Sequence, residues 1–152
     1  MKTNAYLRAA TMEDAQLLFE WANDEECRKN SFHSKHIEWE EHLAWLDKQL
    51  LDAESKIYIY IDKDRMIGQI RFTPHMDGYM ISYSIAKQHR CQGYGKQILM
   101  LAETKMSELG GKSSLYAQVK YSNIASQHLF EQLGYDKNEL QNFIEYRKIE
   151  KV

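Results

Sequence analysis

An apolar run, a loop with two glycines and a long helical pattern follow one another directly in the second half of the chain. Residues 79–86 (YMISYSIA) are rich in β-branched and aromatic side chains and predict a strand. The loop RCQGYG, residues 90–95, precedes a helical pattern that runs to about Leu109, where Gly110 and Gly111 predict its end. Residues 115–120 predict the next strand. This order predicts a βαβ-like unit with two parallel strands.

The other elements predict antiparallel pairs around that unit. We expect strands at residues 6–10, 56–61 and 66–73, helices at 11–22, 38–52 and 123–133, turns at 62–65 and 74–78, and a final hairpin at 136–149. Residues 23–36 are polar without a clear period. The order βααβββαβαββ predicts one mixed α/β domain over residues 1–152. Its six- to seven-stranded, mostly antiparallel sheet is flanked by about four helices.

Composition excludes several classes of protein. The 152 residues carry a formal net charge of −2, which argues against a nucleic-acid or membrane-surface role. Neither a signal peptide nor a membrane-spanning apolar run is visible, so we expect a cytoplasmic, reduced protein. Cys27 has no visible His–Asp pairing that would make it a nucleophile. We expect no metal, because His33, His36, His42 and His128 lack suitably spaced partners and are interpreted as solvated.

The loop at residues 90–95 has the features of an anion site. A helix begins with unpaired backbone N–H groups and partial positive charge. Gly93 and Gly95 remove side chains that would keep an anion away, and Lys96 adds a full charge. These features make a pyrophosphate site physically reasonable, although two glycines at the start of a helix are by themselves more often a structural turn. The Walker A loop and the dinucleotide fingerprint both fail, because Arg90 and Ile98 stand where those motifs require glycine.

Two segments together resemble the GNAT superfamily of acyl-CoA N-acyltransferases. The first is SIAKQHRCQGYGKQILM, in which Arg90, Gly93 and Gly95 fill the fixed positions of the family's central motif. The second is NIASQHLFEQLGY, which matches the C-terminal pattern at Asn123, Ser126, Phe130 and Gly134-Tyr135. The resemblance implies that acetyl-CoA lies in a V-shaped opening between two parallel strands. It implies cofactor contacts from Ile85, Arg90, Gln92, Gly93, Tyr94, Gly95, Lys96, Asn123 and Phe130.

The N-terminal part resembles a narrower group of acetyltransferases, which act on a UDP-linked amino sugar in bacterial pseudaminic-acid-type biosynthesis. The matching pieces are FEWAND (19–24), the Arg28, Asn30, Ser31 and Phe32 cluster, WEEHLAWL (39–46) and GQIRF (68–72). The resemblance implies a small-molecule amine as the partner, bound by a monomer or homodimer.

Alternation along two predicted strands supports a polar acceptor. Gln69 and Arg71 share one face of their strand, and Ser82 and Ser84 share one face of the next. An arginine beside a serine row suits a cleft for a diphosphate or a hydroxylated ring, although it also suits pairing with a surface carboxylate. Trp21 and Phe32 fit either stacking on a flat substrate or packing in the core.

We expect direct attack of a neutral amine on the thioester, with strand amides near Ile85 polarising the carbonyl. Many relatives carry Tyr at the position of Phe130, so the usual acid is missing. Tyr121 is the candidate replacement, and Ser82 is the candidate relay for the amine proton through water. Two alternatives remain: the acceptor is a protein N-terminus, an amino acid or a polyamine, or the chain is a non-catalytic acyl-CoA-binding module.

Overall fold

The computed structural model describes residues 4–109 and 114–149. The first half contains β1 (Tyr6–Ala9), the 3-10 helix η1 (Met12–Asp14), α1 (Ala15–Ala22), α2 (Glu25–Asn30), α3 (Trp39–Leu51), β2 (Lys56–Asp62), β3 (Arg65–His75) and β4 (Gly78–Ile85). The second half contains η2 (Lys87–His89), α4 (Tyr94–Leu109), β5 (Ser114–Val119), α5 (Ile124–Gln132), β6 (Asp136–Glu139) and β7 (Ile144–Ile149). Gly110 and Gly111, which the sequence predicts as the end of a helix, lie outside the described residues.

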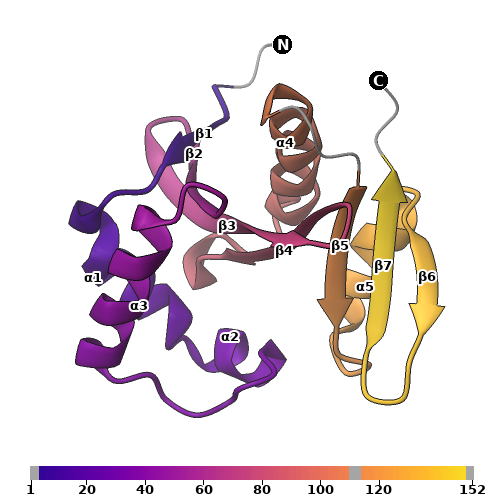
Figure 1. Ribbon diagram of the computed structural model, residues 1–152, viewed down its shortest axis with the longest axis horizontal. Coiled ribbons are helices and arrows are strands. Elements are labelled where there is room, and N and C mark those ends of the chain that lie inside the picture. The colour runs from indigo at the N-terminus through magenta and orange to yellow at the C-terminus, as the bar shows by residue number, and fades with distance from the viewer. Residues whose placement is uncertain (1–3, 110–113, 150–152) are drawn as a thin grey trace.

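All strands belong to one seven-stranded sheet with the order β1-β2-β3-β4-β5-β7-β6 (Figure 1). The pair β4–β5 is parallel, and the other neighbouring pairs are antiparallel. This arrangement confirms the predicted mixed, mostly antiparallel fold. The β2–β3 turn has Lys63 (φ 53°) and Asp64 (φ 64°) in left-handed conformations, which suit a tight hairpin with the twist of the flanking strands.

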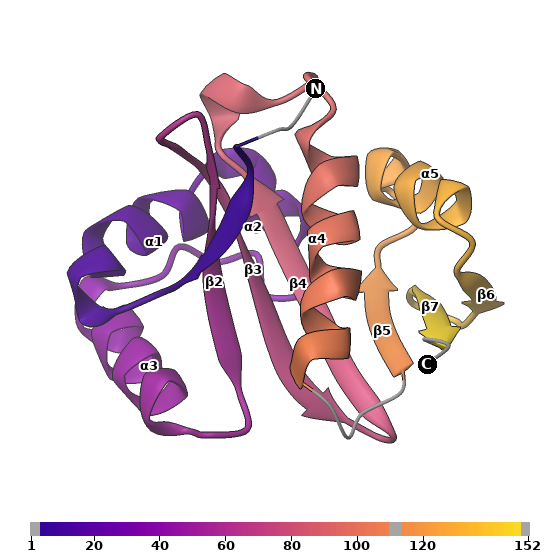
Figure 2. The same cartoon turned by 90° about the horizontal axis from the view of Figure 1, so that it is seen from above.

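Two hydrophobic clusters hold helices against the sheet. Strand β2 alternates between them, because successive strand side chains point to opposite faces. Tyr58 and Tyr60 belong to the larger cluster, which includes residues of α4 and α5, while Ile57 and Ile59 belong to the cluster with α1 and α3. Figures 1 and 2 show α1 and α3 gathered beside β1 and β2, with α4 and α5 on the other side of the sheet.

Helix α2 was not predicted, so the order between the first two strands holds three α-helices rather than two. None of its six residues, EECRKN, is buried, and the segment has no repeating apolar positions that would have predicted a helix. Local chemistry forms it instead: the Asp24 side chain accepts a hydrogen bond from the Cys27 amide at 3.1 Å. Acidic residues stand in its first turn and basic residues in its last, which complements the helix dipole.

Among residues 4–109 and 114–149, no helix is both long and apolar enough to cross a membrane.

Candidate functional site

Strands β4 and β5 separate after a short paired stretch. Their ladder joins Gly78 to Ser114 and ends where Met80 meets Tyr116, although β4 continues to Ile85 and β5 to Val119. Gly78 permits the close approach, because a Cβ there would lie 1.7 Å from the Ser114 carbonyl oxygen. The strands therefore pair at one end and diverge at the other, as Figure 1 shows.

Backbone polar groups of β4 point into this opening. The Ala86 amide donates to the Ile67 carbonyl at 2.8 Å, which marks a hydrogen-bonded pair with β3. Such pairs alternate along an antiparallel ladder, so Ser84 also forms one, and Tyr83 and Ile85 turn their backbone groups away from β3. The Ile85 carbonyl accepts Nε of Arg90 at 3.0 Å. The Ile85 N–H is left facing the opening.

The loop before α4 presents a row of free amides. Arg90 N donates to the Lys87 carbonyl at 3.4 Å, and Gln97 N donates to the Gly93 carbonyl at 3.4 Å. Between these bonds, the amides of residues 91–96 meet no hydrogen-bond acceptor within the described part of the chain. Cys91 (φ 61°) and Gly93 (φ 84°) are both left-handed, a conformation that turns successive N–H groups toward one side. This amide-lined loop, residues 91–96, can therefore hold an anion.

The side chains around this loop have structural roles. The Tyr94 hydroxyl donates to Asp62 at 2.9 Å and accepts from Arg65 at 3.1 Å, which fixes the start of α4 against the β2–β3 hairpin. Gly95 allows α4 and α5 to approach, because a Cβ there would lie 2.8 Å from Leu129 Cδ1. Its absent side chain thus serves helix packing, a reason that the sequence did not reveal. Gln92 and Lys96 are exposed.

On the opposite face of the sheet, β3 and β4 place polar side chains beneath α2. Gln69 Nε2 donates to Ser84 Oγ at 3.1 Å, and Arg71 stands opposite Ser82 in the register. Ser82 is exposed. This matches the predicted alternation, in which these residues lie across the sheet from the core side chains of Ile70 and Ile81.

Arg71 is a cation without a carboxylate partner. Its guanidinium lies 5.1 Å from the centroid of the Trp45 ring and makes no hydrogen bond or ion pair with any described residue. Burial lowers the pKa of this guanidinium, and the nearby charge of Arg28 lowers it further. The sequence also allowed Arg71 to pair with a surface carboxylate. No described carboxylate forms that ion pair.

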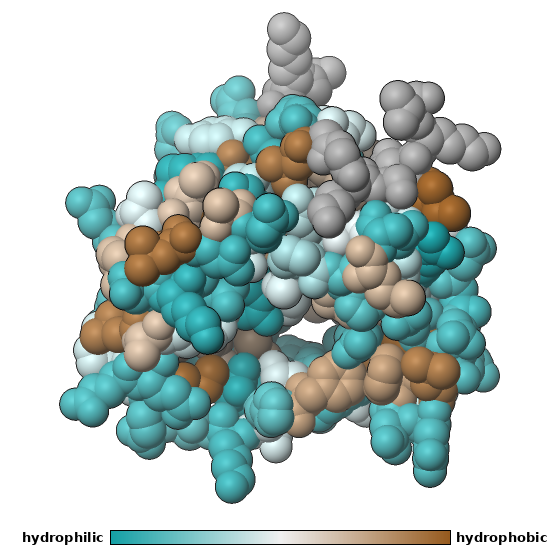
Figure 3. Space-filling view, in the orientation of Figure 1, coloured by the Kyte–Doolittle hydropathy of each residue, from teal (hydrophilic) through white to brown (hydrophobic). Residues whose placement is uncertain are grey.

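The segment around α2 reaches across to the second half of the sheet. Phe32 and Phe143 meet edge to face at a centroid distance of 5.6 Å, and Lys120 Nζ donates to the Lys29 carbonyl at 3.0 Å. Figure 3 shows a hollow between the elements that Figure 1 labels α2, β4 and β5. The opening between the strands can thus be approached from the α2 side.

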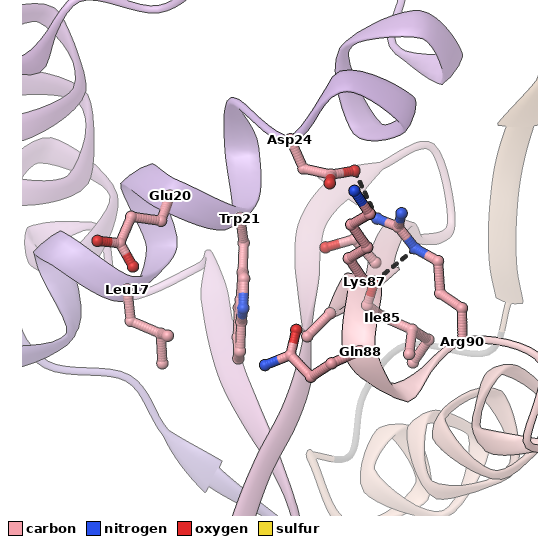
Figure 4. A pocket seen from close by; sticks show the side chains of 10 residues that line it. Leu17, Glu20, Trp21, Asp24, Ile85, Lys87, Gln88 and Arg90 are labelled. Atoms are coloured by element: carbon pink, nitrogen blue, oxygen red, sulfur yellow. Dashed lines mark hydrogen bonds and ion pairs between the residues drawn. The ribbon is translucent and has the colours of Figure 1, made fainter.

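A cavity of about 240 Å³ lies between α1 and the end of β4. Trp21, Glu20 and Leu17 line one wall, and Ser84, Ile85 and Gln88 line the other (Figure 4). The Arg90 guanidinium crosses one end: Nη2 meets Asp24 Oδ2 at 2.6 Å and Nη1 meets Glu26 Oε2 at 3.1 Å.

Some residues predicted to bind substrate instead shape the α2 segment. The Arg28 guanidinium donates to the carbonyls of Ala22 (2.6 Å) and His33 (2.7 Å) and to Ser31 Oγ (3.2 Å). Ser31 Oγ in turn donates to the Cys27 carbonyl at 2.7 Å. These polar groups are already used within the chain, so we correct their role to positioning.

Phe32 and Asn30 are the other members of the predicted cluster. Phe32 is 49% exposed, and its contact with Phe143 joins the segment after α2 to the loop between β6 and β7. Asn30 is half-buried, and its side chain makes no hydrogen bond with a described residue. Its side chain is therefore still able to bind a ligand.

Two further residues differ from their predicted roles. The Tyr121 side chain is 42% exposed, and its hydroxyl donates to the Leu140 carbonyl, so its proton is already used within the described chain. Phe130 is 1% exposed and stacks on Tyr146 at 5.2 Å, so it packs in the core. These contacts depend on tertiary structure that no local pattern encodes.

A hydrogen bond between β4 and α5 was not predicted from the sequence. Tyr83 Oη and Ser126 Oγ lie 2.7 Å apart. Ser126 follows the helix cap Asn123, whose Oδ1 accepts the Ser126 amide at 3.3 Å. The alternation of β4 already indicates that Tyr83 faces away from Ser82 and Ser84, and this was the available signal.

His42 is also a correction, because it is buried rather than solvated. It is 2% exposed, and its Nε2 lies 3.0 Å from the Ala15 carbonyl. Burial lowers the pKa of His42 despite that hydrogen bond. Within the described residues, no group of three or more His, Cys, Asp or Glu side chains could hold a metal ion.

The sequence matches a known protein family over residues 15–135, and that family is the acetyltransferase (GNAT) family. The match covers α1 through the end of α5, and with them the diverging strands and the amide-lined loop. The chain therefore belongs to the acetyltransferase (GNAT) family, and its activity is acetyl-CoA-dependent N-acetyl transfer. Comparison with curated protein sequences gave no match.

Solved structures share the fold at low sequence identity. A spermidine N-acetyltransferase from Vibrio cholerae, in complex with CoA and spermine, has a TM-score of 0.87 and 16% identity over 95% of each chain. The ribosomal L7/L12 α-N-protein acetyltransferase RimL, in complex with CoA, has a TM-score of 0.83 and 16% identity over 97% of this chain and 95% of its own. A domain from Methanocaldococcus jannaschii DSM 2661 has a TM-score of 0.84 and 22% identity over 97% of this chain and 99% of its own. At these identities the likeness establishes the fold and leaves the acceptor open.

Proposed function

We propose that this chain transfers the acetyl group of acetyl-CoA to the amine of a nucleotide-activated, UDP-linked amino sugar, by direct attack in a ternary complex. Acetyl-CoA supplies the activated acetyl group. The acceptor enters from the α2 side of the sheet, and the observation that carries this choice is the unpaired guanidinium of Arg71.

The residues present fit acetyl-CoA. Residues 91–96 offer amides without acceptors at the start of a long helix, which suits a pyrophosphate. The exposed Lys96 adds positive charge there. Asn123 uses Oδ1 to cap α5, so its Nδ2 is left to donate to the pantetheine arm. The Ile85 N–H, which faces the opening, is our candidate for a further contact with that arm.

One face of the sheet carries Gln69, Arg71, Ser82 and Ser84, and we call it the acceptor face. Its side chains support a negatively charged, flat substrate. The half-buried Arg71 guanidinium has a ring contact with Trp45 but no anionic partner among the described residues, and a phosphate oxygen would compensate its charge. Arg28 adds to the positive potential, because its hydrogen bonds go to uncharged oxygens. Trp21 lines the neighbouring cavity and offers a ring on which a uracil can stack.

A polyamine fits this face less well, because a polycation needs free carboxylates. Asp24 and Glu26 are both paired with Arg90. Glu20 lines the cavity and accepts a hydrogen bond from Gln16 at 3.0 Å. One such carboxylate does not make an acidic groove. A protein N-terminus and an amino acid are the remaining alternatives for the acceptor.

We assign a supporting role in proton transfer to Ser82. It is exposed on the acceptor face, opposite Arg71, and its hydroxyl makes no hydrogen bond with a described residue. Ser82 can therefore order a water that accepts the proton of the attacking amine. A sugar amine is less basic than a lysine, so this weak relay is sufficient.

The test is release of free CoA from acetyl-CoA in the presence of a UDP-linked amino sugar, spermidine or a short peptide with a free N-terminus. We expect the UDP-linked amino sugar to give the highest kcat/KM and UDP to inhibit competitively against it. A higher kcat/KM for spermidine or for the peptide would overturn the assignment of the acceptor.

The variant Arg71→Met sharpens this test. It keeps the bulk of the side chain and removes the charge, so we expect KM for the UDP-linked amino sugar to rise about tenfold or more. KM for acetyl-CoA should stay unchanged. Lys137→Met on β6 is the matched control, because it removes a cation that is paired with Glu139 at the far edge of the sheet.

A further inference from the structure

The geometry points to Tyr83 as the residue that protonates the leaving sulfur of coenzyme A, with Ser126 as the residue that positions it. This inference rests on the proposed place of acetyl-CoA between β4 and β5. It replaces Tyr121, whose hydroxyl is bonded to the Leu140 carbonyl on an exposed part of the surface.

Tyr83 stands on the part of β4 that has no β5 partner. The parallel ladder ends at Met80, and Tyr83 follows three residues later. Its side chain crosses from β4 to α5, where its hydroxyl lies 2.7 Å from Ser126 Oγ. The Tyr83 ring also packs against Phe130, with centroids 6.2 Å apart. The hydroxyl therefore lies on the α5 side of the opening, away from the acceptor face.

Neighbouring groups place this hydroxyl beside the proposed cofactor path. Ser126 lies in the first turn of α5, and its amide is bonded to Asn123, which we assign to the pantetheine arm. On the other side, a Cβ on Gly95 would lie 4.0 Å from Tyr83 Cε2, so the ring also borders the start of α4. The phenol thus lies between the amide-lined loop and the residue that would hold the arm.

The hydrogen bond leaves a proton available. Each hydroxyl can donate once and accept, so Ser126 can donate to Tyr83 Oη while the phenol proton points to a ligand. Burial raises the pKa of Tyr83, which keeps the phenol protonated at neutral pH. After proton transfer, the same Ser126 donor stabilises the phenolate.

The proton balance is simple. The amine nitrogen forms its bond to the acetyl carbon, and the carbon–sulfur bond breaks with its electron pair on sulfur. Tyr83 gives its hydroxyl proton to that sulfur as the bond breaks. The surplus proton on nitrogen passes to water on the Ser82 side, and the Tyr83 phenolate regains a proton from water. The step needs no further reactant.

The decisive variant is Tyr83→Phe, assayed with whichever amine of the panel reacts best. We expect kcat to fall by about 100-fold or more, with KM changing little. The dissociation constant for CoA, measured by calorimetry, should stay within about threefold of the original, because the lost hydroxyl acts on the reacting atoms. Tyr79→Phe is the control: it lies on the same strand and face but within the paired stretch, and its kcat should not change.

Ser126→Ala tests the positioning residue. We expect kcat to fall by about tenfold with an unchanged dissociation constant for CoA. A Tyr83→Phe enzyme that keeps kcat within about twofold of the original would overturn the inference, as would one whose only defect is weaker CoA binding. If instead the original protein fails to bind CoA, the proposed function fails and the Tyr83 assignment fails with it. A different preferred amine would leave the Tyr83 test intact.

Discussion

The Arg90 guanidinium joins Asp24 at 2.6 Å and, through its Nε, the Ile85 carbonyl at 3.0 Å. Asp24 is the cap of α2, on the acceptor side, and Ile85 ends the strand that borders the proposed cofactor site. The Arg90 side chain, at the start of the loop before α4, therefore connects the two proposed substrate regions (Figure 4). Burial opposes ionisation of Asp24, but the hydrogen bonds and charge of its partners prevail and lower its pKa.

Asp24 has two separable roles, the helix cap and the ion pair. Asp24→Asn keeps an oxygen for the Cys27 amide and loses the charge, whereas Asp24→Ala loses both. We expect the alanine variant to be less stable than the asparagine variant by about 1 kcal/mol, measured as the free energy of unfolding in urea. Equal stability of the two variants would show that the cap contributes nothing.

Arg90→Lys tests the connection between the two regions. Three nitrogens of the planar Arg90 guanidinium bond two carboxylates and one carbonyl at the same time. Lysine keeps the positive charge, but its single ammonium group cannot make all three contacts. We expect KM to rise several-fold for both acetyl-CoA and the amine, as determined by steady-state kinetics. Lys105→Met, which removes a surface cation of α4, should leave both constants unchanged. A rise confined to acetyl-CoA would mean that Arg90 acts on the cofactor alone.

Gly95 and Leu129 form a packing pair between α4 and α5. In the native background, Gly95→Ala should lower the free energy of unfolding by about 1–3 kcal/mol, because the new Cβ meets Leu129 Cδ1 at 2.8 Å. With Leu129→Ala already present, the same change should stabilise the protein by up to about 1 kcal/mol, since alanine favours a helix over glycine. Equal effects in both backgrounds would mean that the two positions are not in contact.

His42 makes stability depend on pH. Its pKa is lowered in the folded state, mainly by burial, from the ordinary value of 6.5. The unfolded chain therefore binds the proton first, so stability is lost as the pH falls below that value. We expect the original protein to lose more unfolding free energy than His42→Gln between about pH 7.5 and 5.5. Parallel losses in the two proteins would contradict a buried, neutral His42.

Much of the fold could be predicted because its signals are local. The alternation in Gln69, Arg71, Ser82 and Ser84 predicted which face each side chain occupies, and the register agrees. Helix α2 was missed because its cap and charges, rather than an apolar stripe, hold it together. His42 was misplaced because its burial depends on packing between α1 and α3.

The backbone part of the proposed site has a local signal in the sequence. The glycines at 93 and 95 indicated an anion loop, which stays a prediction, and the amides of residues 91–96 have no acceptor in the described chain. Side-chain roles were harder, because hydrogen-bond partners come from distant segments. Tyr121 is engaged by Leu140, and Tyr83 finds its partner 43 residues away in Ser126.

The most direct test of the account is a crystal structure of the protein with CoA. We predict that the arm of CoA lies between β4 and β5 and that its pyrophosphate binds the amides of residues 91–96. We also predict that the sulfur lies within hydrogen-bond reach of Tyr83 Oη. A pyrophosphate bound elsewhere, with these amides turned to solvent, would contradict it.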